Sequence, residues 1–180
     1  MRYISLLRGI NVSGHKKIKM ADLRAKYESL GLKNVITYIQ SGNIIFDAES
    51  PDRTGLKKEI EKAIEQRYKF HVPIEIRTVG EIENIIRNCP FGLVDPVVEG
   101  TILSVTFLSS EPSEKRVSEI QNFADASEKL VVNGNEVYLY SPNGYGKTKL
   151  SNAFLEKKLG VAATTRNWKT VHKLYELSQM

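Results

Sequence analysis

The sequence predicts an α+β protein made of two similar units that follow one another along the chain. Three observations support this prediction. The expected strands and helices run in the order β-α-β-β-α-β twice, each half carries a hairpin whose turn contains Gly and Asn, and 180 residues are enough for two small cores. This order is that of ferredoxin-like, or α/β-plait, folds, and an extra helix is expected at the C-terminal end.

The first unit is expected to cover residues 1–80. Its elements should be, in order, a strand at 3–8, a basic loop at 9–19, a helix at 20–30, hairpin strands at 35–39 and 44–47, a helix opened by Ser50 and Pro51, and a strand at 72–79. Leu23 and Tyr27 recur at helical spacing, and Gly31 stands where helices commonly end. Residues 40–43, Gln-Ser-Gly-Asn, have the composition of a tight turn.

The second unit is expected to cover residues 101–180, after a connecting helix and loop at 81–100. Its elements should be a strand at 101–108, a helix opened by Pro112, hairpin strands at 129–132 and 136–140, a helix at 149–159, a strand at 161–164 and a closing helix at 168–177. Asn133 and Gly134 supply the hairpin turn. The two hairpins align when the glycine shifts by one place, which favours a duplicated unit without proving common descent.

The composition is that of an ordinary globular protein, with 41% hydrophobic and 26% charged residues. The single cysteine, Cys89, excludes a disulfide framework and a cysteine-built zinc site. The three histidines lack ligand spacing, so no metal and no other cofactor are expected. Arg8 interrupts the apolar start before a signal-peptide core forms, and no later apolar run has membrane-spanning length. We therefore expect a cytoplasmic location and no membrane partner.

Positive charge is concentrated near both ends of the chain. The net charge is only +5, but residues 1–33 hold eight basic and two acidic residues, and residues 147–173 hold seven basic and one acidic residue. Much of this excess falls in loops rich in Gly and Asn, where anions tend to bind. The plain alternative is a set of solvated helix faces, because exposed lysines need no ligand.

Topology predicts where these loops lie. In a β-α-β-β-α-β unit the first strand and the first hairpin strand run parallel, so residues 8–19 and 40–43 should share one end of the first sheet. By the same argument, residues 141–148 and 164–168 should share an end of the second sheet. Two basic loop clusters are therefore expected.

The tripeptide Gly146-Lys147-Thr148 invites comparison with a phosphate-binding loop. Ser141 stands where the first glycine of that loop belongs, so a nucleotide triphosphatase is not favoured. Two interpretations stay open. One is an anion site that uses the amides near Gly146 with the charges of Lys147 and Lys149, and the other is a glycine turn with surface lysines.

Four segments carry a resemblance to a known family: Leu7-Arg8-Gly9-Ile10-Asn11-Val12, Tyr38-Ile39-Gln40-Ser41-Gly42-Asn43, Gly144-Tyr145-Gly146-Lys147-Thr148-Lys149-Leu150 and Ala163-Thr164-Thr165-Arg166-Asn167-Trp168. Through them the chain resembles the bacterial family of domain of unknown function 1697 (DUF1697), from the first strand to the last helix. The resemblance implies a tandem ferredoxin-like structure and no biochemical role. A serine is expected at position 148 in this family, and Thr148 keeps its hydroxyl.

The sequence leads to the hypothesis that the protein binds an anionic ligand, either nucleic acid or a phosphate-bearing, nucleotide-like molecule. The candidate ligand-binding residues are Arg8, Asn11, Lys16, Lys17, Gln40, Asn43, Lys147, Lys149, Arg166 and Asn167. Two alternatives stay open. One is an enzyme on a small phosphorylated or carboxylated substrate, for which no catalytic residue is identified. The other is a protein–protein interaction module that uses an apolar patch or a sheet edge. No oligomeric state is predicted.

Overall fold

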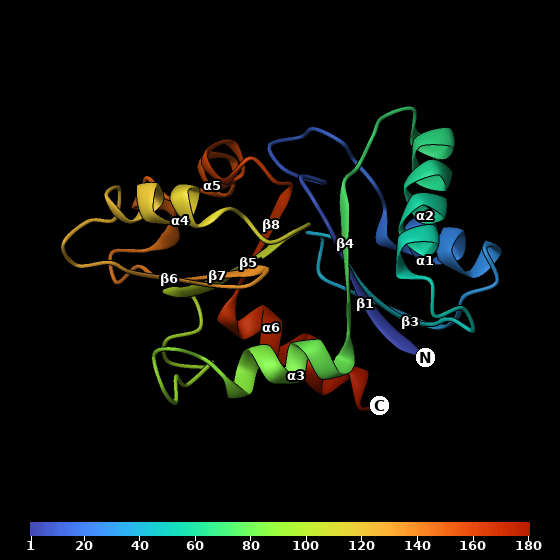
Figure 1. Ribbon diagram of the computed structural model, residues 1–180. Helices are drawn as coiled ribbons and strands as arrows, with labels where there is room; N and C mark the ends of the chain where they lie inside the picture. The colour runs from blue at the N-terminus through green and yellow to red at the C-terminus, as the bar shows by residue number, and fades with distance from the viewer. The chain divides into compact units, whose positions relative to one another are not determined.

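The computed structural model describes residues 1–180 and contains two four-stranded antiparallel sheets and six α-helices (Figure 1). The expected α+β class is confirmed, and the sheets are compatible with tandem plait units. The chain divides into two compact units. One consists of Met1–Ile82 together with Leu174–Met180, and the other consists of Glu83–Lys173.

The first unit has one layer of strands and one layer of helices. Its elements are β1 (Arg2–Leu7), α1 (Met20–Ser29), β2 (Lys33–Tyr38), β3 (Asn43–Asp47), α2 (Arg53–Tyr68) and β4 (Ile74–Thr78), which leads into α3 (Val79–Arg87). The strand order is β2-β3-β1-β4, with every neighbouring pair antiparallel. Leu23 of α1 and Ile60 of α2 are buried with Phe46 and Ile76 of the sheet, so the core lies between the helices and one sheet face, as Figure 1 shows.

The start of α2 differs from its prediction. Asp52, not Ser50, caps this helix, because the Asp52 carboxylate accepts a hydrogen bond from the Gly55 amide at 3.0 Å. Ser50 instead accepts a hydrogen bond from the Asp52 amide at 3.1 Å. A charged acceptor makes the stronger bond to an unpaired helix amide, which is the physical reason why the aspartate takes the position.

The second unit repeats this arrangement. Its elements are β5 (Leu103–Leu108), α4 (Glu114–Gln121), β6 (Lys129–Asn133), β7 (Glu136–Tyr140), the short 3-10 helix η1 (Tyr145–Lys147), α5 (Asn152–Leu159) and β8 (Ala163–Asn167), which leads into α6 (Trp168–Ser178). The strand order is β6-β7-β5-β8, again antiparallel throughout. Ile120 of α4 and Leu155 of α5 are buried with Leu108 and Leu139 of the sheet.

Strand β8 lies further along the chain than the predicted strand at 161–164. Its later residues Thr165, Arg166 and Asn167 pair with β5, and the hydroxyls of Thr165 and Thr106 are hydrogen-bonded at 2.8 Å. The residues of β8 are mostly polar, so a prediction based on hydrophobic pattern does not identify them as a strand.

A helix follows the last strand of each unit directly. Thr78 accepts a hydrogen bond from the Glu81 amide at the start of α3, and Asn167 accepts one from the Thr170 amide at the start of α6. Both residues thus cap their helix through the amide three positions later. The repeated pattern is therefore β-α-β-β-α-β-α, whereas the sequence predicted α3 as a connecting helix and α6 as an extra C-terminal helix.

Candidate functional site

Three segments of the first unit meet at one end of its sheet, where β1 and β2 finish and β4 begins. The Leu7 amide donates to the Gly42 carbonyl at 2.8 Å, and the Arg8 amide donates to the Pro73 carbonyl at 2.9 Å. The ammonium group of Lys16 donates to the His71 carbonyl at 2.6 Å. We call the segments 8–19, 39–42 and 69–73 together the basic end.

Every titratable side chain of the basic end is basic: Arg8, His15, Lys16, Lys17, Lys19, Lys69 and His71. The three segments contain no Asp or Glu. Lys17, Lys19 and Lys69 are exposed, and none of them, nor Lys16, forms a salt bridge. Charges of one sign that no ion pair neutralises raise the local concentration of anions.

The loop at residues 8–19 is held by the side chain of Asn11. Its Oδ1 accepts a hydrogen bond from the Ile18 amide, and its Nδ2 donates to the carbonyls of Ile18 and Gln40, each at 2.9 Å. Asn11 itself has a left-handed backbone, with φ of 54°. These bonds occupy the amide group, so Asn11 shapes the loop that carries the lysines.

Asn43 has a comparable architectural role in the hairpin. Its side chain is buried, and its Nδ2 donates to the Tyr38 carbonyl and to the Ser41 hydroxyl, each at 3.0 Å. Gln40, by contrast, is exposed. Of the six candidates in the first unit, Lys17 and Gln40 are exposed, Arg8 and Lys16 are partly exposed, and the two asparagines support the loops.

The second cluster has a different local structure. The amides of Gly144 and Lys147 donate to the carbonyls of Ser141 and Gly144, and the Leu150 amide donates to the Thr148 hydroxyl. These amides are satisfied within the loop and do not converge on an external anion. Lys147 and Lys149 are exposed. The pKa of Asp125 is lowered, first by hydrogen bonds from Ser127 and to a smaller extent by the charge of Lys149.

Arg166 has a different environment from that of these lysines. The neighbouring Thr165 donates a hydrogen bond to Asn152 at the start of α5, so alternation along β8 turns Arg166 toward the opposite face of the sheet. Arg166 is buried, and burial lowers its pKa to about 10. Asn167 caps α6, as described above. In the second unit, Lys147 and Lys149 are thus exposed in one loop, whereas Arg166 is buried and Asn167 caps a helix.

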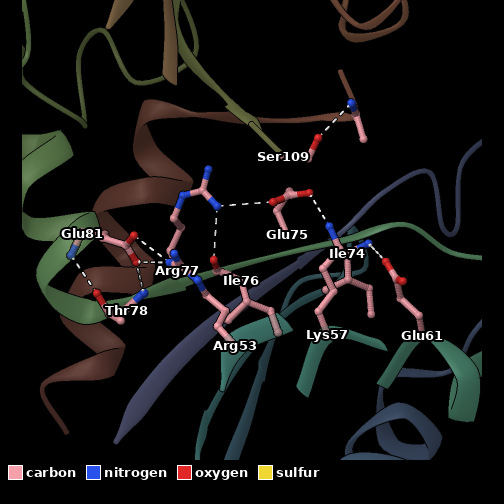
Figure 2. A network of polar contacts seen from close by, with 11 residues as sticks. Arg53, Lys57, Glu61, Ile74, Glu75, Ile76, Arg77, Thr78, Glu81 and Ser109 are labelled. Carbon is pink, nitrogen blue, oxygen red and sulfur yellow. Dashed lines mark hydrogen bonds and ion pairs between the residues drawn. The ribbon is translucent and has the colours of Figure 1, made fainter. Parts of the chain in front are cut away.

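Strand β4 carries a buried ionic network that was not predicted from the sequence. In Figure 2, Glu75 lies between Lys57 and Arg77, with its Oε1 2.8 Å from Lys57 Nζ and its Oε2 3.3 Å from Arg77 Nη1. The side chains of Glu75 and Arg77 are 7% and 6% exposed. Alternating apolar and charged residues in Ile74-Glu75-Ile76-Arg77 are typical of a strand with one solvated face, so the pattern carried no signal of burial.

Arg77 and Arg166 occupy corresponding places in the two units. Each is the next-to-last residue of its strand, Arg77 pairing with Ile4 and Arg166 with Val105 of the adjacent strand. The duplication therefore extends to a buried arginine beside the helix that follows.

Comparison with known proteins agrees with this architecture. A family model described as "Protein of unknown function (DUF1697)" matches residues 1–138, from β1 into β7. The chain belongs to the DUF1697 family. Among solved structures, the fold is similar to that of the conserved bacterial protein SP0830 from Streptococcus pneumoniae, with a TM-score of 0.72 and 25% sequence identity over 98% of each chain. No curated protein matches the chain.

The DUF1697 name assigns no activity. None of the helices has the length and apolar character needed to cross a membrane. The contacts of Leu7, Arg8 and Lys16 bring the cations of the first unit together at one end of its sheet.

Proposed function

We propose that the protein binds an anionic ligand, single-stranded nucleic acid or a nucleotide-like phosphate, at the basic end of the first unit. One observation carries this proposal: three segments distant in sequence meet there, all their titratable groups are basic, and their four lysines have no ion-pair partner. The residues expected to contact the ligand are Arg8, Lys16, Lys17 and Gln40, together with the exposed Lys19.

The rigidity of the loop supports this proposal. Asn11 joins the loop to the hairpin turn, and Gly42 packs so closely on Leu7 and Ile10 that a Cβ at position 42 would lie 2.7 Å from each. Cations fixed on a braced loop lose less conformational entropy on binding than cations on a mobile one. Lysines held in this way therefore bind phosphate with a smaller penalty.

We infer a cytoplasmic location and a ferredoxin-like fold for each unit as further parts of this proposal. The free thiol of Cys89 suits a reducing compartment. The order of strands in each sheet supports the fold assignment.

The test is titration of a fluorescein-labelled oligodeoxythymidylate, followed by fluorescence anisotropy at several salt concentrations. We expect the logarithm of affinity to fall linearly with the logarithm of salt concentration, because each neutralised phosphate releases counterions. The double variant Lys17→Gln/Lys19→Gln should reduce this slope by up to about 1.4, because each phosphate that a lysine neutralises on a single strand contributes about 0.7.

Lys58→Gln/Lys62→Gln is the matched control, because both lysines are exposed on α2 and the net charge changes equally. An equal loss of affinity in both double variants would show that net charge alone attracts the oligonucleotide. Absence of binding at low salt would exclude nucleic acid, and competition by tripolyphosphate then tests the phosphate-bearing small molecule separately.

A further inference from the structure

Exposed large apolar side chains are concentrated in two places. Three of them, Leu93, Val97 and Val98, lie in the loop at residues 88–102 between α3 and β5, and two more, Val12 and Ile39, lie in the basic end. The other three large apolar side chains on the surface are Met1, Phe123 and Met180. Single exposed apolar residues are ordinary, but a group on one short loop indicates a contact surface.

The loop at residues 88–102, which we call the apolar loop, has a defined internal structure. The Trp168 indole donates to the Val94 carbonyl at 3.0 Å, and Asp95 Oδ1 accepts from the amides of Val97 and Val98 at 2.7 and 3.3 Å. Only glycine fits at position 100, because a Cβ there would collide with the Pro96 carbonyl. The loop is thus braced from the buried side while Leu93 and Val97 remain 107% and 83% exposed.

The two apolar surfaces carry opposite charge. The apolar loop contains Asp95 and Glu99 and no Lys or Arg, and neither acid forms a salt bridge. The basic end contains seven basic residues and no acid. The apolar loop combines apolar and acidic side chains, and the basic end combines apolar and basic side chains. The two surfaces therefore complement each other, whereas two copies of the same surface would repel.

We propose that the apolar loop of one copy of this chain docks on the basic end of a second copy. Leu93 and Val97 of one copy would pack against Val12 and Ile39 of the other and be buried there. Asp95 and Glu99 would face the lysines of the basic end. Because the two surfaces differ, the contact is heterologous. The inference does not depend on a ligand, but an anion bound at the basic end would compete with the second copy.

Sedimentation velocity over a range of protein and salt concentrations tests this proposal. We expect reversible self-association that weakens as salt screens the opposite charges. The loop variant Leu93→Ser/Val97→Ser and the end variant Val12→Ser/Lys17→Glu should each weaken the association by about tenfold or more. Met180→Ser removes a side chain of similar exposure outside both surfaces and should leave association unchanged.

Mixing the two variants gives the sharpest result. The loop variant keeps an intact basic end, and the end variant keeps an intact apolar loop. An equimolar mixture should therefore form a heterodimer at a concentration where neither variant associates alone. A loop-to-loop contact predicts instead that the end variant associates as strongly as the wild type, and that result would overturn the proposal. A wild-type protein that remains monomeric at every concentration would also overturn it. Oligodeoxythymidylate binding by that monomer would leave the proposed function standing, which separates the two failures.

Unfolding is excluded as an explanation by measuring the circular dichroism and thermal midpoint of each variant. All the substituted side chains are exposed, so native spectra are expected. Recovery on mixing is an internal control as well, because a misfolded variant could not restore the contact.

Discussion

The side-chain amide of Asn11 donates a hydrogen bond to the main-chain carbonyl of Gln40 across 2.9 Å. This bond joins the loop after β1 to the β2–β3 turn, and two further bonds join Asn11 to Ile18. The conformation of the basic end therefore depends on the hydrogen bonds of Asn11 as well as on the hydrophobic core.

Replacing Asn11 with alanine should lower the free energy of unfolding by about 2–3 kcal/mol, because three hydrogen bonds are removed and alanine tolerates a φ of 54° poorly. Asn11→Gly removes the same bonds without the backbone penalty and should cost less. Urea denaturation measures both. Equal stability of the two variants would show that the left-handed backbone at Asn11 contributes nothing.

Gly42→Ala should destabilise the protein by about 2 kcal/mol or more, because the added methyl group strains a φ of 81° and meets Leu7 and Ile10 at 2.7 Å. Gly31→Ala is the matched comparison, since its φ is 78° and its Cβ would have no neighbour within 4 Å. That variant should cost only about 1 kcal/mol. The difference between their thermal or urea midpoints isolates the close packing of the turn, and similar losses would contradict it.

Substitution of Glu75 by glutamine should cost about 3 kcal/mol, because it removes a buried negative charge that faces both Arg77 and Lys57. Lys57→Met should cost about 1 kcal/mol or less, since the lysine side chain is 28% exposed and leaves Arg77 beside Glu75. Chemical denaturation at neutral pH checks the order of these losses. A larger loss for Lys57→Met would show that Arg77 does not depend on the Glu75 charge.

The environment of Glu81 should make the free energy of unfolding depend on pH. Burial alone would raise its pKa, but hydrogen bonds from Arg53 and from the Thr78 amide outweigh burial and hold the pKa below its ordinary value. A lowered pKa contributes stability that is present above the unfolded value of about 4.3 and is lost as pH falls through the folded value.

Glu81→Gln should therefore destabilise the protein by about 1 kcal/mol at pH 7, the scale of a helix-cap bond, and much less at acid pH. Urea unfolding of both proteins across the acid range measures this convergence. A difference that stays constant down to the lowest pH would rule out the carboxylate as its source.

Ile39→Asn should raise the free energy of unfolding by about 1 kcal/mol, because a β-branched residue at φ of 49° is strained and its side chain is 47% exposed. Val12→Asn serves for comparison, since Val12 is also exposed and β-branched but lacks a positive φ. It should change stability little. A stabilised Ile39→Asn protein that associates more weakly with its own copy would link this strain to the proposed contact.

Most of the elements follow from local sequence. Leu23, Tyr27, Leu56, Ile60 and Ile64 recur at helical spacing and are buried, and Gly31 and Gly134 mark a helix end and a hairpin turn with positive φ. The basic character of the loops is equally local, since it is a matter of composition. These features depend on periodicities and backbone preferences that neighbouring residues impose on one another.

The candidate site was only partly predictable. Topology placed residues 8–19 beside the hairpin turn, but it did not include residues 69–73, whose His71 carbonyl holds Lys16. The hydrophobic pattern of the sequence predicts which segments are strands and in which order they follow one another. It does not predict that residues 69–73, which lead into the edge strand β4, come close to Lys16 when the sheet forms.

The sequence by itself determined the α+β class, the repeated order of elements and the distribution of charge, because these depend on short-range periodicity and composition. Tertiary structure alone decided which polar groups reach the surface where a ligand could bind. It committed the side chains of Asn11 and Asn43 to hydrogen bonds with the main chain, buried Arg166 and left Lys147 exposed, and buried Glu75 with Arg77. Burial depends on contacts between residues far apart in the chain, and local sequence patterns do not reveal those contacts.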